Sequence, residues 1–282
     1  MASLILVSLV AVALPLKAEG LKDNPATHSS KWEFTFTPYF WAFWMNADQT
    51  VKGQTVSIDA HLFEILSNSD GLNAMPWYSA QEARLGRFSL YSDIQYSNLG
   101  FSGGQTASTG LGSGLSIAGT LDFELAVLEG GVTYEISRLS RQTALDVTAG
   151  LRYWYMNVDL NLAVAGPLPP GLTPIGGGLA VAKSGDVDWV DPVIGLRLRH
   201  EMSPSQRIVM RGDIGGFGAG SDFTWQLLGA YSFDFAQRHG ITFSGKIGYR
   251  ALSVDYVDGV GSNRFAYDAI QHGPIVGLGM KW

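Results

Sequence analysis

Five histidines are the starting point for any catalytic interpretation, because the imidazole ring is the commonest general base near neutral pH. His28 lies in a polar leader and His239 in a short turn, so no rigid element holds either of them. His200 lacks the second histidine four residues later that a zinc-protease helix requires. His61 and His272 have the surroundings of surface histidines, and no Gly-x-Ser-x-Gly elbow occurs. We therefore predict no catalytic residue, no metal site and no cofactor, in a protein that is not an enzyme.

Charged residues that alternate with apolar ones offer a second kind of chemistry. Both signs occur on neighbouring segments, so the side chains can pair with one another in a structural network or surround a selective aqueous path. The sequence leaves both alternatives open. In a membrane-spanning chain they must face inward, because Arg or Lys facing lipid costs about 2–4 kcal/mol near the midplane. The predicted interior residues are Glu82, Arg84, Asp93, Asp146, Arg152, Asp191, Arg197, Arg199, Arg211, Asp213, Lys246 and Arg250.

Four arginines make this prediction specific. Arg152, Arg197, Arg211 and Arg250 each directly follow a residue of the apolar face, so each belongs to the opposite face of its segment. We expect all four to point inward and to meet Glu or Asp on adjacent strands.

Composition limits the class of protein that can hold charges in this way. Only 16% of the residues are charged, against about 25% in an average soluble domain. A mean hydropathy of +0.10 is too low for a bundle of membrane helices, whereas a membrane barrel alternates apolar and polar residues and averages near zero. The absence of cysteine excludes thiolate chemistry. A net charge of −6 gives no basic surface for nucleic acid.

The elements that must position the charges are β-strands, because the dominant period from Trp32 onward is two. In residues 88–97 the apolar Phe88, Leu90 and Ile94 occupy the face opposite Asp93. The same division recurs in residues 145–155 and 222–235. Each segment therefore has one apolar and one polar face.

Short polar turns alternate with long Gly/Pro-rich loops. Bacterial outer-membrane barrels have short periplasmic turns and longer outer loops, so this pattern predicts an all-β, transmembrane, antiparallel up-and-down barrel with both termini in the periplasm. The turns are 85–87, 138–142, 203–206 and 236–239, and the loops 100–116, 165–185, 217–221 and 258–265. About ten strands are expected, near 32–45, 75–86, 88–101, 117–137, 142–163, 186–201, 206–217, 222–235, 240–256 and 266–282.

Residues 46–74 are assigned to the first outer loop. Thr50 to Ile58 reads as a small hairpin and His61 to Leu66 as a short helix. The alternative is that this region adds two barrel strands, giving twelve.

The two ends of the chain have patterns typical of targeting signals. The apolar run from Leu4 to Leu16 is too short for a membrane anchor, so residues 1–18 are predicted to be a signal peptide, 19–31 a flexible periplasmic leader and 32–282 the barrel. At the other end Val276, Leu278, Met280 and Trp282 alternate with glycine and lysine. This pattern resembles the C-terminal signal read by the barrel assembly machinery.

Several motifs resemble a family of uncharacterised bacterial outer-membrane β-barrel proteins. They are Trp189-Val190-Asp191-Pro192-Val193-Ile194-Gly195-Leu196-Arg197, Gly212-Asp213-Ile214-Gly215-Gly216-Phe217-Gly218 and Gly248-Tyr249-Arg250. The resemblance implies the fold over residues 32–282 and brings no reaction or ligand with it.

The predicted function follows from barrel size and charge. Barrels of about eight strands are filled by side chains and open porins need about 16, so a wide porin is disfavoured. We expect an integral protein of the Gram-negative outer membrane, either a narrow porin-like channel for small polar solutes or a non-conducting structural or surface-binding barrel. An enzyme acting on envelope lipids is a third, less favoured alternative. The expected partners are outer-membrane lipids and lipopolysaccharide, the barrel assembly machinery and periplasmic chaperones, but not nucleic acid.

Overall fold

The computed structural model describes residues 31–51, 54–61, 76–108, 114–165, 179–261 and 264–282. The predicted signal peptide and, apart from Lys31, the predicted leader lie outside these ranges. Twelve strands form one sheet, and the described residues contain no α-helix. The strands are β1 (Glu33–Trp41), β2 (Trp44–Val51), β3 (Gln54–His61), β4 (Trp77–Leu85), β5 (Phe88–Ser108), β6 (Gly114–Arg138), β7 (Thr143–Ala165), β8 (Leu179–Ser203), β9 (Gln206–Gly216), β10 (Phe223–Arg238), β11 (Ile241–Asp258) and β12 (Phe265–Lys281).

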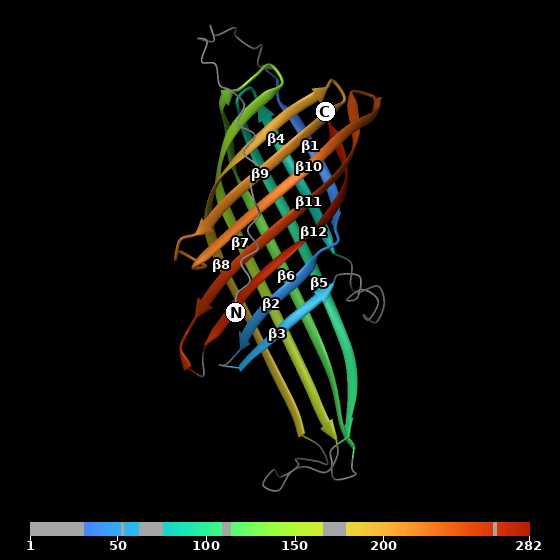
Figure 1. The fold of residues 1–282 in the computed structure, drawn as a ribbon, viewed down its shortest axis with the longest axis vertical. Helices are drawn as coiled ribbons and strands as arrows, with labels where there is room; N and C mark the ends of the chain where they lie inside the picture. The colour runs from blue at the N-terminus through green and yellow to red at the C-terminus, as the bar shows by residue number, and fades with distance from the viewer. Residues whose placement is uncertain (1–30, 52–53, 62–75, 109–113, 166–178, 262–263) are drawn as a thin grey trace.

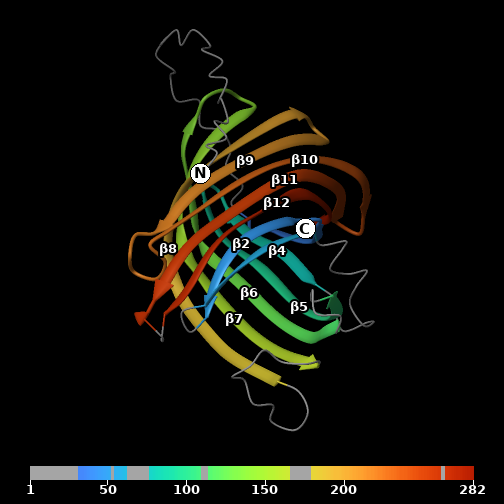
Figure 2. The ribbon, with the colours of Figure 1, turned by 60° about the horizontal axis from the view of Figure 1, so that its bottom comes forward.

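Ten of these strands close into an antiparallel barrel. β1 and β4 to β12 pair with their neighbours in chain order, and β12 pairs with β1 to complete the ring (Figures 1 and 2). At the closure the Phe34 and Trp282 backbones exchange two N–H to O hydrogen bonds of 3.0 Å. The predicted all-β barrel of about ten strands is therefore confirmed.

The first predicted strand, 32–45, is interrupted rather than continuous. β1 ends at Trp41 and β2 begins at Trp44, and both pair with β12, on either side of Pro274. Proline has no N–H to donate to a neighbouring strand, and here its carbonyl oxygen accepts from the Ala42 N–H at 3.0 Å. The ladder is thus irregular where the proline stands.

The predicted hairpin is present but begins earlier than expected. β2 pairs with β12 on one side and with β3 on the other, and no further partner of β3 is found among the described residues. The hairpin extends the sheet beyond the closed ring, so the barrel has ten strands and not twelve. His61 ends β3 instead of opening a helix, and residues 62–75, where the rest of the predicted helix would fall, lie outside the described ranges.

The short turns all lie at one end of the barrel, together with the chain end at Trp282, and this end is called the turn end (upper in Figure 1). Three turns stand where they were predicted. The fourth is shifted, because β10 continues to Arg238 and the chain reverses at His239 and Gly240. Both residues have positive φ, 51° and 81°, as a two-residue hairpin turn matching the twist of the strands requires.

The opposite, loop end is built differently from the prediction. Residues 100–116 and 165–185 were expected to be loops, but 100–108, 114–116, 165 and 179–185 continue β5, β6, β7 and β8. The rest of the two predicted loops, 109–113 and 166–178, lies outside the described residues. These strands project beyond the closed ring (lower end of Figure 1). A backbone ladder needs only paired N–H and C=O groups, so segments rich in Gly, Ser and Thr can continue it without an apolar face.

Candidate functional site: the barrel interior

All twelve predicted interior residues point into the barrel, where most meet side chains from distant strands. The turn-end half of the interior holds a group of ion pairs centred on Asp146. Arg197 donates to Asp146 at 2.8 Å and reaches Glu82 across the lumen at 3.0 Å. Arg199 donates to the same aspartate at 2.7 Å, and Arg84 lies 3.4 Å from it. Three guanidinium groups thus share one buried carboxylate.

A second group of ion pairs is more deeply buried. Arg152 donates to Glu129 at 2.8 Å and to Asp213 at 2.6 Å, and all three side chains are fully buried. Arg211 pairs with the same two carboxylates, at 3.1 Å from Asp213, and its guanidinium lies over the Tyr91 ring. Buried charges are tolerated only when they are paired and hydrogen-bonded, and this cluster meets that requirement.

Arg250 joins the charged region to the aromatic one. Its guanidinium donates to the Tyr39 hydroxyl at 2.8 Å and to Asp93 at 3.2 Å. With the Gln95 amide oxygen turned toward it, that oxygen accepts from Arg250 at 2.7 Å. The guanidinium also lies 5.2 Å from the centre of the Trp41 ring.

The partners differ from the expectation of adjacent strands. Arg152 with Glu129 and Arg197 with Asp146 are neighbouring-strand pairs, but Arg250 reaches Asp93 across the lumen, as Arg211 reaches Glu129. The interior is narrow enough for Arg side chains to span it, so ion pairs connect opposite walls as well as adjacent strands.

On the loop-end side of these ion pairs the interior becomes aromatic and aliphatic. Trp189 stacks between Trp154 and Tyr256, with ring centres 5.6 and 4.0 Å apart. The set, called the aromatic layer, receives side chains from most of the strands. Its members are Trp41, Phe43, Met45, Tyr78, Leu125, Val127, Trp154, Met156, Trp189, Leu252, Val254, Tyr256 and Tyr267.

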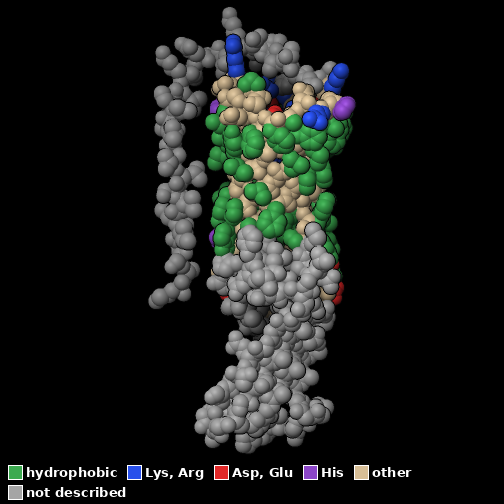
Figure 3. All heavy atoms as spheres, turned by 90° about the vertical axis from the view of Figure 1, so that its right-hand side faces the viewer, with side chains coloured by type: hydrophobic (Ala, Val, Ile, Leu, Met, Phe, Trp, Pro, Cys, Tyr) green, Lys and Arg blue, Asp and Glu red, His purple; other side chains and the backbone are tan. Residues whose placement is uncertain are grey.

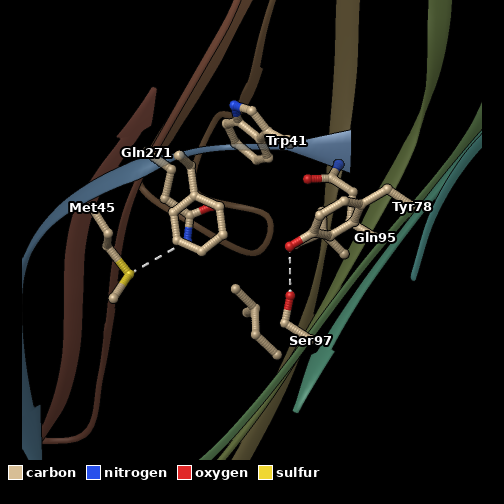
Figure 4. Close-up of a pocket in the computed structure, with 9 residues that line it drawn as sticks. Trp41, Met45, Tyr78, Gln95, Ser97 and Gln271 are labelled. Atoms are coloured by element: carbon tan, nitrogen blue, oxygen red, sulfur yellow. Dashed lines mark hydrogen bonds between the residues drawn. The ribbon is translucent and has the colours of Figure 1, made fainter. Parts of the chain in front are cut away.

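Two cavities measure the contrast between the halves. A cavity of about 10 Å³ lies within the aromatic layer, bordered by Trp41, Met45 and Tyr78 (Figure 4). That is the least space that holds one water molecule. The Tyr78 hydroxyl is paired with Ser97 at 2.8 Å, whereas the buried Trp41 Nε1 has no hydrogen-bond partner in the described structure. In the charged half a cavity of about 350 Å³, called the vestibule, reaches the rim at the turn end, where Glu33 and Lys281 line it.

Asp191 and Lys246, the remaining predicted interior residues, have no carboxylate–cation pair within 4 Å among the described residues. Asp191 instead accepts from the Trp189 indole at 3.2 Å and from the Ser221 N–H at 2.6 Å. It therefore fixes the loop between β9 and β10 to the wall. Lys246 lines the vestibule.

Sequence reasoning overlooked the aromatic layer and two acids of the ion-pair clusters. The spacing along each strand could have revealed the aromatic layer, because residues two apart share a face. Trp154 is two residues from Arg152, Trp189 two from Asp191, and Leu252 two from Arg250. The two overlooked acids, Glu129 and Glu135, lie an even number of residues apart on β6 and so share its inner face. Glu135 pairs with Arg199 at 2.8 Å.

The histidines do not form a catalytic group in the described structure. His272 faces outward and bonds the Tyr249 hydroxyl at 2.7 Å, and His200 bonds Thr143 at 2.9 Å. His28 lies outside the described residues. No cluster of three or more His, Asp or Glu side chains placed to hold a metal ion occurs in the described ranges. That the protein is not an enzyme stays a prediction.

The outer surface is apolar and has aromatic residues near both ends. Hydrophobic side chains are spread over the described part of the face shown in Figure 3, among tan backbone and other side chains, while Lys and Arg stand at the turn end. Phe34, Phe235 and Trp282 are exposed near the turns, and Trp44 and Trp77 toward the loop end. Between them the exposed residues include Leu90, Leu128, Leu151, Ile194, Leu196, Met210, Leu227, Ile247, Val276 and Leu278.

The four residues of the predicted assembly signal all face outward on the closing strand. Val276, Leu278 and Trp282 are among the exposed hydrophobic residues, and Trp282 stacks on Phe34 with ring centres 6.0 Å apart. Gly277 and Gly279 face the interior beside Thr37 and Lys246.

Comparison with known proteins gives structural likenesses alone. No family model and no curated protein matches the sequence. The fold is similar to the outer-membrane protease OmpT of Escherichia coli, with 9% identity, a TM-score of 0.47 and coverage of 91% of this chain and 98% of that one. It is also similar to the translocator domain of the autotransporter NalP of Neisseria meningitidis, with 13% identity, a TM-score of 0.39 and coverage of 89% of this chain and 88% of that one. A third similar structure is the attachment invasion locus protein Ail of Yersinia pestis, with 8% identity, a TM-score of 0.34 and coverage of 89% of this chain and 99% of that one. These likenesses are too low to carry a function, and the resemblance to an uncharacterised family stays a prediction.

Proposed function

We propose that the protein is an integral barrel of the bacterial outer membrane that does not conduct. The membrane assignment rests on the outer surface. Trp225 and Phe235 lie ten residues apart on β10, which is about 33 Å of strand and about 25 Å of depth at a tilt of about 40°. That depth matches the apolar band of outer-membrane barrels, about 25 Å tall between aromatic girdles. In water this face would be an aggregation surface.

The orientation follows from the turns. Outer-membrane barrels keep short turns in the periplasm and long extensions outside. The turn end of this chain then faces the periplasm, and the projecting parts of β5 to β8 face outward. The vestibule opens toward the periplasm in this orientation, and the aromatic layer lies between it and the exterior.

The single observation that carries the non-conducting assignment is the aromatic layer. Trp154, Trp189 and Tyr256 are stacked face to face and buried, and an ion passing between such rings would lose its hydration. The charges at the edge of the layer, on Asp191 and Arg250, already hold partners. A barrel closed in this way serves as a rigid platform in the membrane for its outer extensions. Lipopolysaccharide and lipid would surround it, and the assembly machinery would read its C-terminal residues.

Planar bilayer recordings test this proposal directly. Folded protein, verified by its heat-dependent mobility on gels, is expected to give no discrete conductance steps. Reproducible steps from the wild-type chain would contradict the proposal and favour the alternative, a narrow channel for small polar solutes. The observation that favours this alternative is the vestibule itself, because charged walls on one side of a narrow constriction are what an ion path requires.

A further inference from the structure

Lys246 differs from every other cation that lines the vestibule. Each of the seven others has a carboxylate oxygen within 4 Å, whereas no such partner of Lys246 is found among the described residues. The paired cations are Arg84, Arg197, Arg199, Arg207, Arg211, Arg250 and Lys281.

The position of Lys246 is set by glycines on the neighbouring strand. Its Cε lies 2.9 Å from the place where a Cβ of Gly279 would stand, so a side chain there would have to displace it. The Lys246 side chain therefore crosses β12 where Gly279 has no side chain, and its ammonium donates to Thr37 Oγ1 on β1 at 2.8 Å. An ammonium has three N–H donors, so two remain for other acceptors.

Charges of both signs act on the Lys246 ammonium: Glu82 and Asp234 attract it and Arg207 repels it, but neither carboxylate is within ion-pair distance. Ser232 stands opposite Lys246 on one side and opposite Arg207 on the other. It lines the vestibule, and its buried hydroxyl has no hydrogen-bond partner in the described structure. Arg207 is occupied by Asp234 at 2.6 Å. The wall from Arg207 to Lys246 thus carries two cations, one carboxylate and a free hydroxyl.

We propose that this wall is a binding site for a small oxyanion, the carboxylate or phosphate group of a soluble solute that enters from the turn end. The anion accepts from the two remaining donors of Lys246, and the Ser232 hydroxyl becomes a third donor. A lysine ammonium binds phosphate as a point charge, and charge-assisted hydrogen bonds are about twice as strong as neutral ones. The vestibule, at about 350 Å³, lies within the size range of small-ligand pockets.

The proposal rests on the proposed function only for the side from which the solute arrives, so it is testable in lipid-free detergent micelles. The probes are inorganic phosphate and acetate, titrated at constant ionic strength with chloride as the competing salt and followed by calorimetry. Wild-type protein should bind one of them saturably and better than chloride. Lys246→Met should weaken this binding by at least about tenfold.

Lys281→Met is the matched control, because Lys281 lines the same vestibule but is paired with Glu33 at 2.9 Å. Its binding should change less than about twofold. If Lys246→Met fails to fold, Ser232→Ala gives a second test and should weaken binding about threefold or more. Binding no better than chloride, or equal losses in the Lys246 and Lys281 variants, would overturn the proposal. So would binding that requires phosphatidylglycerol vesicles, because the ligand would then be a lipid headgroup.

Discussion

The two halves of the barrel interior are filled by side chains of opposite character, charged in one half and aromatic in the other. Near the turn end charged side chains span the lumen and leave a vestibule of about 350 Å³, whereas toward the loop end aromatic rings leave a cavity of about 10 Å³. Both fillings hold opposite walls together. Only the first leaves room for solutes, and the two fillings meet at Arg250 and Trp41.

The largest effect is expected where the charged half is dry. Arg152→Ala would leave the buried carboxylates of Glu129 and Asp213 without their shared partner, and breaking a buried pair costs about 3–5 kcal/mol. Urea unfolding of the refolded protein measures the loss. A loss below about 1 kcal/mol would mean that water reaches this cluster and that the boundary lies nearer the loop end.

A comparable loss is expected in the aromatic layer, but with a second consequence. Trp189→Ala removes the middle ring of the stack formed with Trp154 and Tyr256, and such truncations cost about 3–5 kcal/mol. We expect the space left behind to open a path through the layer, so bilayer recordings of the folded variant should show conductance that the wild type lacks. A variant as silent as the wild type would show that another part of the layer closes the lumen.

The next largest loss of stability is expected on the lipid-facing surface, at Leu151, the residue before Arg152. Leu151 is 58% exposed on the outer face, so Leu151→Arg should destabilise the barrel by about 2–4 kcal/mol in a bilayer. Leu139→Arg at the turn-end rim, where Leu139 is equally exposed, is the control and should cost about 0–1 kcal/mol. Equal costs at the two positions would contradict the membrane placement.

The smallest effect is expected where the charged half is wet. Arg207 and Asp234 form a pair whose side chains are 34% and 18% exposed, and exposed pairs contribute about 0–1 kcal/mol. Arg207→Ala is therefore the matched control for Arg152→Ala, with the same substitution on the same inner face. A loss as large as that of Arg152→Ala would show that the vestibule is dry.

The sequence predicted the strands best where one face is apolar and the other charged. The alternation of apolar and polar residues around Asp146 and Arg152 was enough to place both side chains inside, because a shift of the strand register by one residue would have turned both toward lipid. It did not predict that Trp154 shares their face, since an aromatic residue is compatible with both the lipid girdle and the interior. The strand ends at Ser108 and Leu179 were not predicted because these segments project beyond the closed ring. A projecting strand needs no apolar face, so its composition resembles that of a loop.

The cross-lumen pairs were also beyond prediction. Whether Arg250 meets Asp93 depends on the diameter and stagger of the closed barrel, which no local pattern encodes. The break at Pro274 could have been inferred, because a proline within a central strand removes a ladder hydrogen bond.

The central claim, that the interior is open from the turn end and closed on the loop-end side of Arg250, is tested most directly by thiol labelling. The chain has no cysteine, so single substitutions report without background. Ala80 lines the vestibule, and Ala269 lies buried against the aromatic layer. In nanodiscs a small charged methanethiosulfonate should modify Ala80→Cys readily and leave Ala269→Cys unmodified until the barrel is unfolded. Equal rates at the two positions in the folded protein would contradict the division of the interior.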